Sequence, residues 1–186
     1  MEKREGIWEE KKSEEQKSEG KEQKSEGKEI ALDSGRDGEK IILEKGKEKE
    51  MFHMEIESRS RNEEFARVVV AVFMSRLDPT LEEIDDVKTA VSEAVTNAII
   101  HGYKGKEGII TIGAVIEEKN LIVTVEDKGA GIPDIEKAME PMYTTDTTGE
   151  RSGMGFSFME AFMDQVYVRS KPGEGTVVTM KKRIGG

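Results

Sequence analysis

The sequence predicts an α+β fold, a two-layer sandwich in which helices cover one face of a mostly antiparallel sheet. Two observations support this prediction. Segments of helical and of strand periodicity follow one another from about residue 53 to the C-terminus. Most of the strands come as hairpins, whose short turns join antiparallel neighbours. We therefore expect a domain at 51–186, which is long enough to bury its own core, and a separate tail at 1–50.

Two long helices and one shorter helix are expected in the domain. Apolar residues recur at helical spacing in the first of them, with Asn62 as a candidate N-cap. Asp78-Pro79-Thr80 interrupts the chain before the second. The expected ranges are 61–77, 81–100 and about 153–163, with a further short helix inside 127–140.

Five strands are expected, of which the first is an edge strand. β-Branched residues fill both arms of a hairpin around Lys119-Asn120. Pro172-Gly173-Glu174-Gly175 is a strong turn signal between the last two strands. The expected ranges are 53–59, 109–117, 121–126, 165–170 and 175–182.

The tail is dominated by Glu, Lys, Ser and Gly, and it repeats Gln-Lys-Ser-Glu-Gly-Lys-Glu at 16–22 and 23–29. The repeat has no apolar residue for the a or d position of a coiled coil. A segment this polar cannot bury enough apolar surface to offset its ordering entropy, so we expect disorder or transient helix. It is either a solvated appendage or an interaction arm, and translation from Met51 or Met54 is a third interpretation.

Composition excludes several classes of function. The absence of cysteine excludes disulfides, thiolate metal sites and a cysteine nucleophile, and the two histidines are far apart in sequence. The net charge of −10 argues against binding nucleic acid. No apolar run is long enough for a membrane span and no secretory signal is visible, so we expect a cytoplasmic protein without membrane contact.

Three short motifs carry the chemistry. Glu93 and Asn97 stand four residues apart on the second helix, so they share a face. That face is either solvated or a site where the amide oxygen ligates Mg²⁺ beside a general base. Asp127-Lys128-Gly129-Ala130-Gly131 follows a strand, either as a tight turn or as a carboxylate beside backbone that a ligand can approach. Gly149 to Gly155 precede a helix, either as a plain loop or as an anion site.

Neither a P-loop nor a dinucleotide-binding glycine motif is present. The order and spacing Glu-x₃-Asn, Asp-x-Gly-x-Gly and Gly-x-Gly instead resemble the N, G1 and G2 boxes of the GHKL ATPase superfamily. Residues 92–103, 131–136 and 150–156 closely resemble the sporulation anti-sigma F factors of endospore-forming bacteria, which are serine-protein kinases. The resemblance covers about residue 54 to the C-terminus. It implies a Bergerat-type fold with ATP and Mg²⁺ in a pocket under a lid at about 133–155.

The resemblance also implies a role for each box residue. Asn97 would hold Mg²⁺, and Glu93 would be the catalytic base acting on the acceptor serine. Asp127 would accept a hydrogen bond from the adenine amino group, and Arg151 would lie against the terminal phosphate. The remaining nucleotide residues would be Gly129 and Gly131 at the base, Gly153 and Gly155 at the phosphates with Ser152, and Thr144 and Thr145 in the lid.

The implied partners are a second copy of the chain, a sigma factor held in the ATP-bound state, and an anti-anti-sigma protein phosphorylated on serine. Arg67 falls where the family contacts its protein partners, although an ordinary surface arginine fits equally well. His101 is either a partner of the helix dipole or a phosphate contact.

Other functions with the same ATP site are less compatible with the sequence. A sensor histidine kinase needs an amphipathic dimerisation helix with a phospho-accepting histidine, and 1–50 contain neither. Gyrase-like and Hsp90-like machines need further domains. The alternatives that stay open are a general-stress-type anti-sigma serine kinase and a non-catalytic, ATP-gated sigma-binding switch, which would have no use for Glu93.

Overall fold

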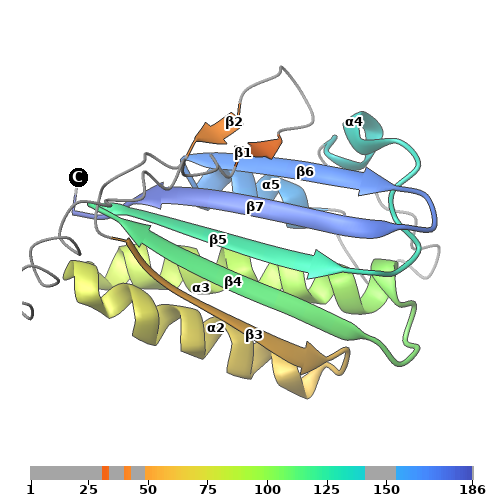
Figure 1. The fold of residues 1–186 in the computed structure, drawn as a ribbon, viewed down its shortest axis with the longest axis horizontal. Helices are drawn as coiled ribbons and strands as arrows, with labels where there is room; N and C mark the ends of the chain where they lie inside the picture. Colours follow the sequence, from red (N-terminus) through yellow and green to blue (C-terminus); the bar gives the residue numbers. More distant parts are fainter. Residues whose placement is uncertain (1–30, 34–39, 43–48, 141–153, 186) are drawn as a thin grey trace, which may run out of the picture.

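A five-stranded antiparallel sheet forms one layer of the molecule (Figure 1). The computed structural model describes residues 31–33, 40–42, 49–140 and 154–185. Its sheet has the order β3-β4-β5-β7-β6, and every neighbouring pair is antiparallel. The strands are β3 (Lys49–Glu57), β4 (Ile109–Glu117), β5 (Asn120–Asp127), β6 (Gln165–Lys171) and β7 (Gly175–Arg183).

Two short strands, β1 (Ala31–Asp33) and β2 (Lys40–Ile42), pair antiparallel with each other in a second sheet. The rest of 1–48, which holds the repeated heptamer, lies outside the described residues, as do 141–153 and Gly186. The predicted tail therefore stays a prediction. Among the described segments, none of the helices is both long and apolar enough to cross a membrane.

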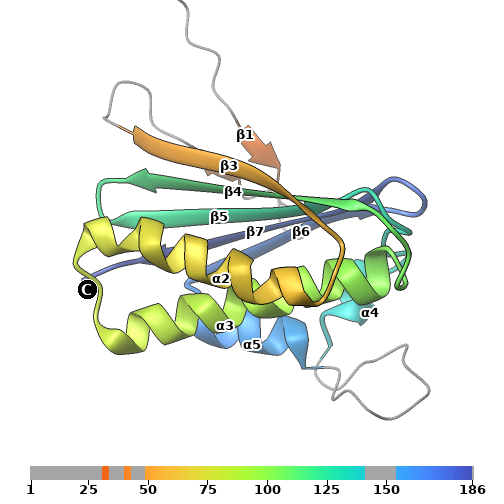
Figure 2. The ribbon, with the colours of Figure 1, turned by 90° about the horizontal axis from the view of Figure 1, so that it is seen from below.

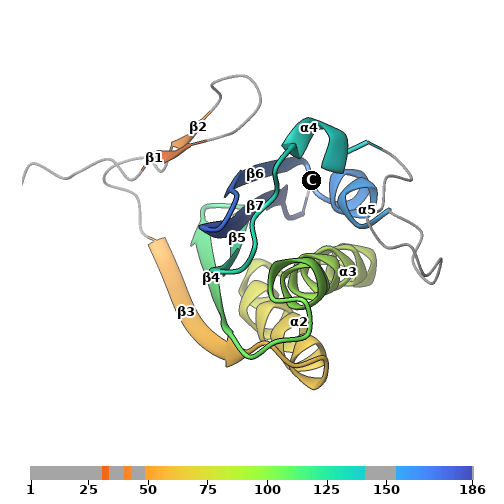
Figure 3. The same cartoon turned by 90° about the vertical axis from the view of Figure 1, so that its right-hand side faces the viewer.

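The helices cover one face of the main sheet (Figures 2 and 3). They are α2 (Arg61–Met74) with a 3₁₀ turn η1 (Ser75–Leu77), α3 (Leu81–Asn97) with a π-helical turn η2 (Ala98–Gly102), α4 (Ile135–Ala138) and α5 (Gly155–Phe162). The predicted α+β sandwich is confirmed. Where the sequence predicted one helix to Ile100, the α-helix ends at Asn97 and a wider turn follows it.

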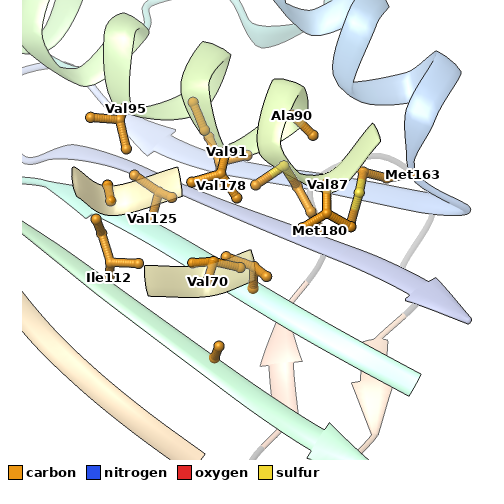
Figure 4. Close-up of a cluster of buried hydrophobic side chains, with 14 of the residues drawn as sticks. Val70, Val87, Ala90, Val91, Val95, Ile112, Val125, Met163, Val178 and Met180 are labelled. Carbon is orange, nitrogen blue, oxygen red and sulfur yellow. The ribbon is translucent and has the colours of Figure 1, made fainter. Parts of the chain in front are cut away.

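The core lies between the sheet and the helices, with α2 and α3 both contributing to it (Figure 4). Val87, Val91 and Val95 recur at helical spacing and are fully buried. Alternate residues of the strands, such as Ile112 and Val178, belong to the same buried cluster, because only every second side chain of a strand faces the helices. Each aliphatic side chain buried in this way stabilises the fold by about 1.5–3 kcal/mol. This packing holds α3 rigidly across the sheet.

The two long helices begin in different ways. At α3, Thr80 Oγ1 accepts from the Glu83 amide at 3.2 Å, and the Glu83 carboxylate accepts from the Thr80 amide at 2.7 Å. This capping box fixes where α3 begins. At α2 the predicted cap, Asn62, is wrong, because the N-cap position is Ser60. The Asn62 amide instead donates to the Glu57 carbonyl at 2.8 Å and ties the helix to the end of β3.

Candidate functional site

A cavity of about 750 Å³ opens where α3, the end of β5 and the start of α5 meet. Its lining includes Asp134 and Ala138, from the segment that carries α4. Glu93 and Asn97 from the first motif, Asp127 and Gly131 from the second, and Gly155 from the third all line it. Three motifs that are far apart in the sequence, from Glu93 to Gly155, therefore belong to one site.

Glu93 and Asn97 face the first residue of α5. A Cβ atom placed on Gly155 would lie 3.0 Å from Glu93 Oε2 and 3.2 Å from Asn97 Nδ2. The two side chains are half-buried and line the cavity. A glycine at position 155 leaves the space beside this carboxylate and amide open to a ligand.

The π-helical turn η2, at the C-terminal end of α3, lies in contact with the second motif. The Tyr103 amide donates to the Ala98 carbonyl at 2.9 Å, one residue further back than in an α-helix. The widened turn places Gly102 so close to Asp127 that a Cβ on Gly102 would lie 2.7 Å from Asp127 Oδ1. Single π-turns of this kind occur often at functional sites.

Asp127 supplies a buried carboxylate at the floor of the cavity. Only 5% of the residue is exposed, and its Oδ1 accepts from the Gly129 amide at 2.8 Å. Burial raises the pKa of Asp127 above its ordinary value, because removing water disfavours the charged form, while hydrogen bonds from the Gly129 and Thr176 amides oppose the rise. The carboxylate is thus an acceptor with little water around it, and a ligand that brings an N–H donor would relieve the desolvation.

The two glycines of the second motif act in different ways. Gly131 has φ +69° and lines the cavity, and a Cβ there would overlap the Lys171 carbonyl. Gly129 is not among the lining residues; a Cβ there would overlap the backbone of Gly102. Gly129 therefore allows the backbones of η2 and of the segment after β5 to lie in contact. It affects the cavity only through the position of Gly102, which does line it.

Several predicted site residues lie outside the cavity as described. Five of them fall in 141–153, outside the described residues: Thr144, Thr145, Arg151, Ser152 and Gly153. Arg67 lies on α2 and does not line the cavity. Its Nε is buried and 3.4 Å from Glu63 Oε1, an ion-pair distance without hydrogen-bond geometry. The same Glu63 oxygen accepts from Ser92 Oγ at 2.5 Å.

The sequence analysis missed other residues of the site. Thr176 and Gly102 line the cavity, and so does Lys104, which has φ +54°. Gly102 follows His101 in the first motif, so its position pointed to the site. Thr176 had no signal of its own, because it reaches the cavity only through its pairing with Asp127 across β5 and β7. His101 also lines the cavity, which keeps both of its interpretations open.

The residues present fit a magnesium nucleotide. A buried acceptor lies at one end and suits the amino group of a purine, while the amide of Asn97 and the carboxylate of Glu93 supply oxygens at the other. Mg²⁺ is usually held by one or two protein oxygens together with substrate phosphates. The described residues contain no group of three or more His, Cys, Asp or Glu side chains placed to hold a metal ion by themselves. The space beside Gly155, which a side chain would fill, leaves room for phosphate.

Comparison with known proteins identifies the family of the domain that contains this site. Residues 56–182 match the family described as Histidine kinase-like ATPase domain. The anti-sigma F factor of Clostridium acetobutylicum is 64% identical over 127 residues, which cover 68% of this chain and 89% of the relative. That of Geobacillus kaustophilus is 54% identical over 133 residues, 71% of this chain and 91% of the relative.

A solved structure agrees with the fold. The RsbU and RsbW domains of a Mycobacterium tuberculosis protein superpose with a TM-score of 0.52 at 19% identity, covering 73% of this chain and 32% of that one. At this level of identity the likeness concerns the fold alone.

Proposed function

The chain belongs to the histidine kinase-like ATPase family and, within it, to the anti-sigma F factors, and from this premise we propose that it is an ATP-dependent serine-protein kinase. It would hold a sporulation sigma factor in the ATP-bound state and phosphorylate a serine of the anti-anti-sigma protein that antagonises it. The observation that carries the proposal is the meeting of Glu93, Asn97, Asp127 and Gly155 around one cavity.

ATP would lie with its base at Asp127 and its phosphates between Asn97 and α5. When bound, ATP with Mg²⁺ supplies the phosphoryl group that is transferred. Asn97 would contribute an oxygen to the metal, and the open space at Gly155 would admit the phosphates. The start of α5 adds the positive end of an eight-residue helix on the same side. Arg151 would neutralise charge at the terminal phosphate, as the family resemblance implies.

Glu93 would act as the general base. Its Oε2 is the nearest atom to the Cβ position of Gly155. With the phosphates in the space beside Gly155, this carboxylate would be close to an incoming hydroxyl, which supports its role as the base. The serine oxygen of the partner would bond to phosphorus as its proton passes to Glu93, and ADP would leave with the electrons of the broken P–O bond. General bases of this kind contribute about 10²–10⁴-fold in rate.

Arg67 would contribute to the protein interface. It lies on α2, outside the cavity, and the same helix exposes three apolar side chains, Phe65, Val68 and Val72. A surface helix that carries both an arginine and exposed apolar residues has the composition expected of a contact region. We propose that the sigma factor, the anti-anti-sigma protein and a second copy of the chain are the partners.

Phosphotransfer to the partner tests the function directly. Purified protein would be mixed with γ-labelled ATP, Mg²⁺ and the anti-anti-sigma protein, and label on the partner's serine would be followed with time. We expect Glu93→Gln to lower the rate by at least about 100-fold while ATP still binds. Glu55→Gln, a matched change on the exposed edge strand β3, should leave the rate unchanged.

Two results would count against the proposal. Wild-type protein that transfers no label to serine would remove the kinase activity and leave the non-catalytic switch. Transfer at the wild-type rate in Glu93→Gln would keep the kinase but remove Glu93 as its base.

A further inference from the structure

Ser170, on β6, is hydrogen-bonded to three residues in two segments, the loop after Gly131 and the start of β7. Its hydroxyl accepts from the Ile132 amide at 2.8 Å and donates to the Gly175 carbonyl at 2.8 Å. It also lies 2.9 Å from Thr176 Oγ1. The side chain of Ser170 therefore connects the loop after Gly131 with the turn between β6 and β7.

The direction of the third bond follows from counting protons. A serine hydroxyl has a single proton, and a backbone carbonyl can only accept. The proton of Ser170 is therefore used at Gly175. The contact with Thr176 must then be donated by the threonine hydroxyl, since the Ile132 amide also approaches the Ser170 oxygen as a donor.

This assignment changes what Thr176 offers to a ligand. With its proton directed at Ser170, the Thr176 hydroxyl can only accept from an atom or a water in the cavity. Thr176 is paired in register with Asp127, and both line the cavity. The base end of the site thus presents two neighbouring acceptors, one from each strand.

We propose that Ser170 is a specificity-determining positioning residue, which holds Thr176 as an acceptor and so selects a purine that carries an amino group. The inference rests on the proposed ATP-binding function. An adenine amino group has two N–H donors for these acceptors or for a water between them. A carbonyl at the same position would face two acceptors and leave buried polar atoms unpaired, which is the kind of mismatch that polar sites reject strongly.

Nucleotide affinities test this role without any catalytic readout. ATP and inosine triphosphate, which carries a carbonyl in place of the amino group, would be titrated calorimetrically into wild-type protein and Ser170→Ala. Without Ser170, the Thr176 proton is free to turn toward the cavity. We expect the preference for ATP over inosine triphosphate to fall by about tenfold, the effect of one mispaired hydrogen bond. Ser75→Ala, which removes a serine hydroxyl bonded to a carbonyl outside the cavity lining, should leave the preference unchanged.

Two further variants separate specificity from loop anchoring. Thr176→Val removes the acceptor but leaves Ser170 and its bond to the Gly131 loop in place, and it should lower the preference to a similar extent. Ser170→Thr keeps the hydroxyl and should restore the preference.

An equal loss of affinity for both nucleotides in Ser170→Ala, with the preference intact in Thr176→Val, would overturn the inference and leave Ser170 as a loop anchor. Wild-type protein that binds no ATP would remove the proposed function itself. Tight ATP binding with an unchanged preference in the variants would overturn only the role of Ser170.

Discussion

The two ends of the cavity are built from different kinds of structure. The base end is made by backbone contacts: Gly129 touches Gly102, Gly131 touches Lys171, and the buried Asp127 accepts from amides. The other end is made by two half-buried side chains of α3 that face the first turn of α5. If the proposed function holds, recognition of the base would be fixed by the sheet and its turns, whereas the reacting end would depend on how two helices are placed against each other.

The largest expected effect comes from crowding the base end. In Gly131→Ala, the new Cβ overlaps the Lys171 carbonyl and the residue keeps φ +69°. We expect the free energy of unfolding to fall by about 3 kcal/mol and ATP binding to be lost. Gly173→Ala is the matched control, because it has φ +80° but open space around its Cβ position, and it should cost only about 1 kcal/mol. Urea denaturation measures both, and equal losses would mean that backbone strain alone explains the glycine.

A smaller effect, confined to chemistry, is expected at the other end. In Gly155→Ala, the Cβ would lie 3.0 Å from Glu93 Oε2, a distance that the side chain can relieve by a small movement. We expect phosphotransfer to slow by about tenfold or more through misplacement of the carboxylate, with little change in stability. Gly113→Ala, whose Cβ would make only an ordinary contact on β4, is the control. An unchanged rate in Gly155→Ala would show that the helices adjust without disturbing Glu93.

The smallest expected effect is a pH dependence of ATP affinity. Burial raises the pKa of Asp127, and the adenine amino group favours the ionised form. ATP affinity should therefore fall as the pH drops through this raised pKa, and binding in that range should release a proton. Calorimetry in buffers of different ionisation enthalpy detects the proton, and Asp127→Asn should abolish the release.

The Asp127 carboxyl also makes the free energy of unfolding depend on pH, in the direction opposite to its effect on ATP affinity. Because its pKa is higher in the folded protein than in the unfolded chain, folding binds a proton. That contribution is fully present below the unfolded pKa and is lost as the pH rises through the folded pKa. The difference in unfolding free energy between wild-type protein and Asp127→Asn isolates this contribution from that of other groups, such as Glu83, whose pKa is lowered. A difference that rose with pH would contradict the assignment.

Much of this architecture could be predicted from local sequence. The turn signals at Pro172-Gly173-Glu174-Gly175 and the β-branched runs placed the hairpins to within a residue or two. The i, i+4 spacing placed Glu93 and Asn97 on one face. The π-turn after Asn97 was not predictable, because Ala98 to Ile100 fitted a continuing helix and the wider turn lies against the end of β5, a contact that no local pattern indicates.

The contacts that define the base end of the cavity could not be predicted from the sequence either. Thr176 lies between Asp127 and Ser170 only because β7 pairs with both β5 and β6 in a particular register. Register depends on the whole sheet rather than on any local pattern. The prediction of Asn62 as the N-cap of α2 was wrong for a related reason, since its side chain bonds to the end of β3 rather than to its own helix.

The division between the two ends can be tested by one crossed measurement. ATP affinity and the single-turnover rate of serine phosphorylation at saturating ATP would be measured in parallel for Asp127→Asn and Glu93→Gln. We predict that Asp127→Asn weakens ATP binding with little effect on the saturated rate, and that Glu93→Gln removes the rate with little effect on binding. Loss of both quantities in both variants would contradict the account, because it would mean that the two ends work as one unit.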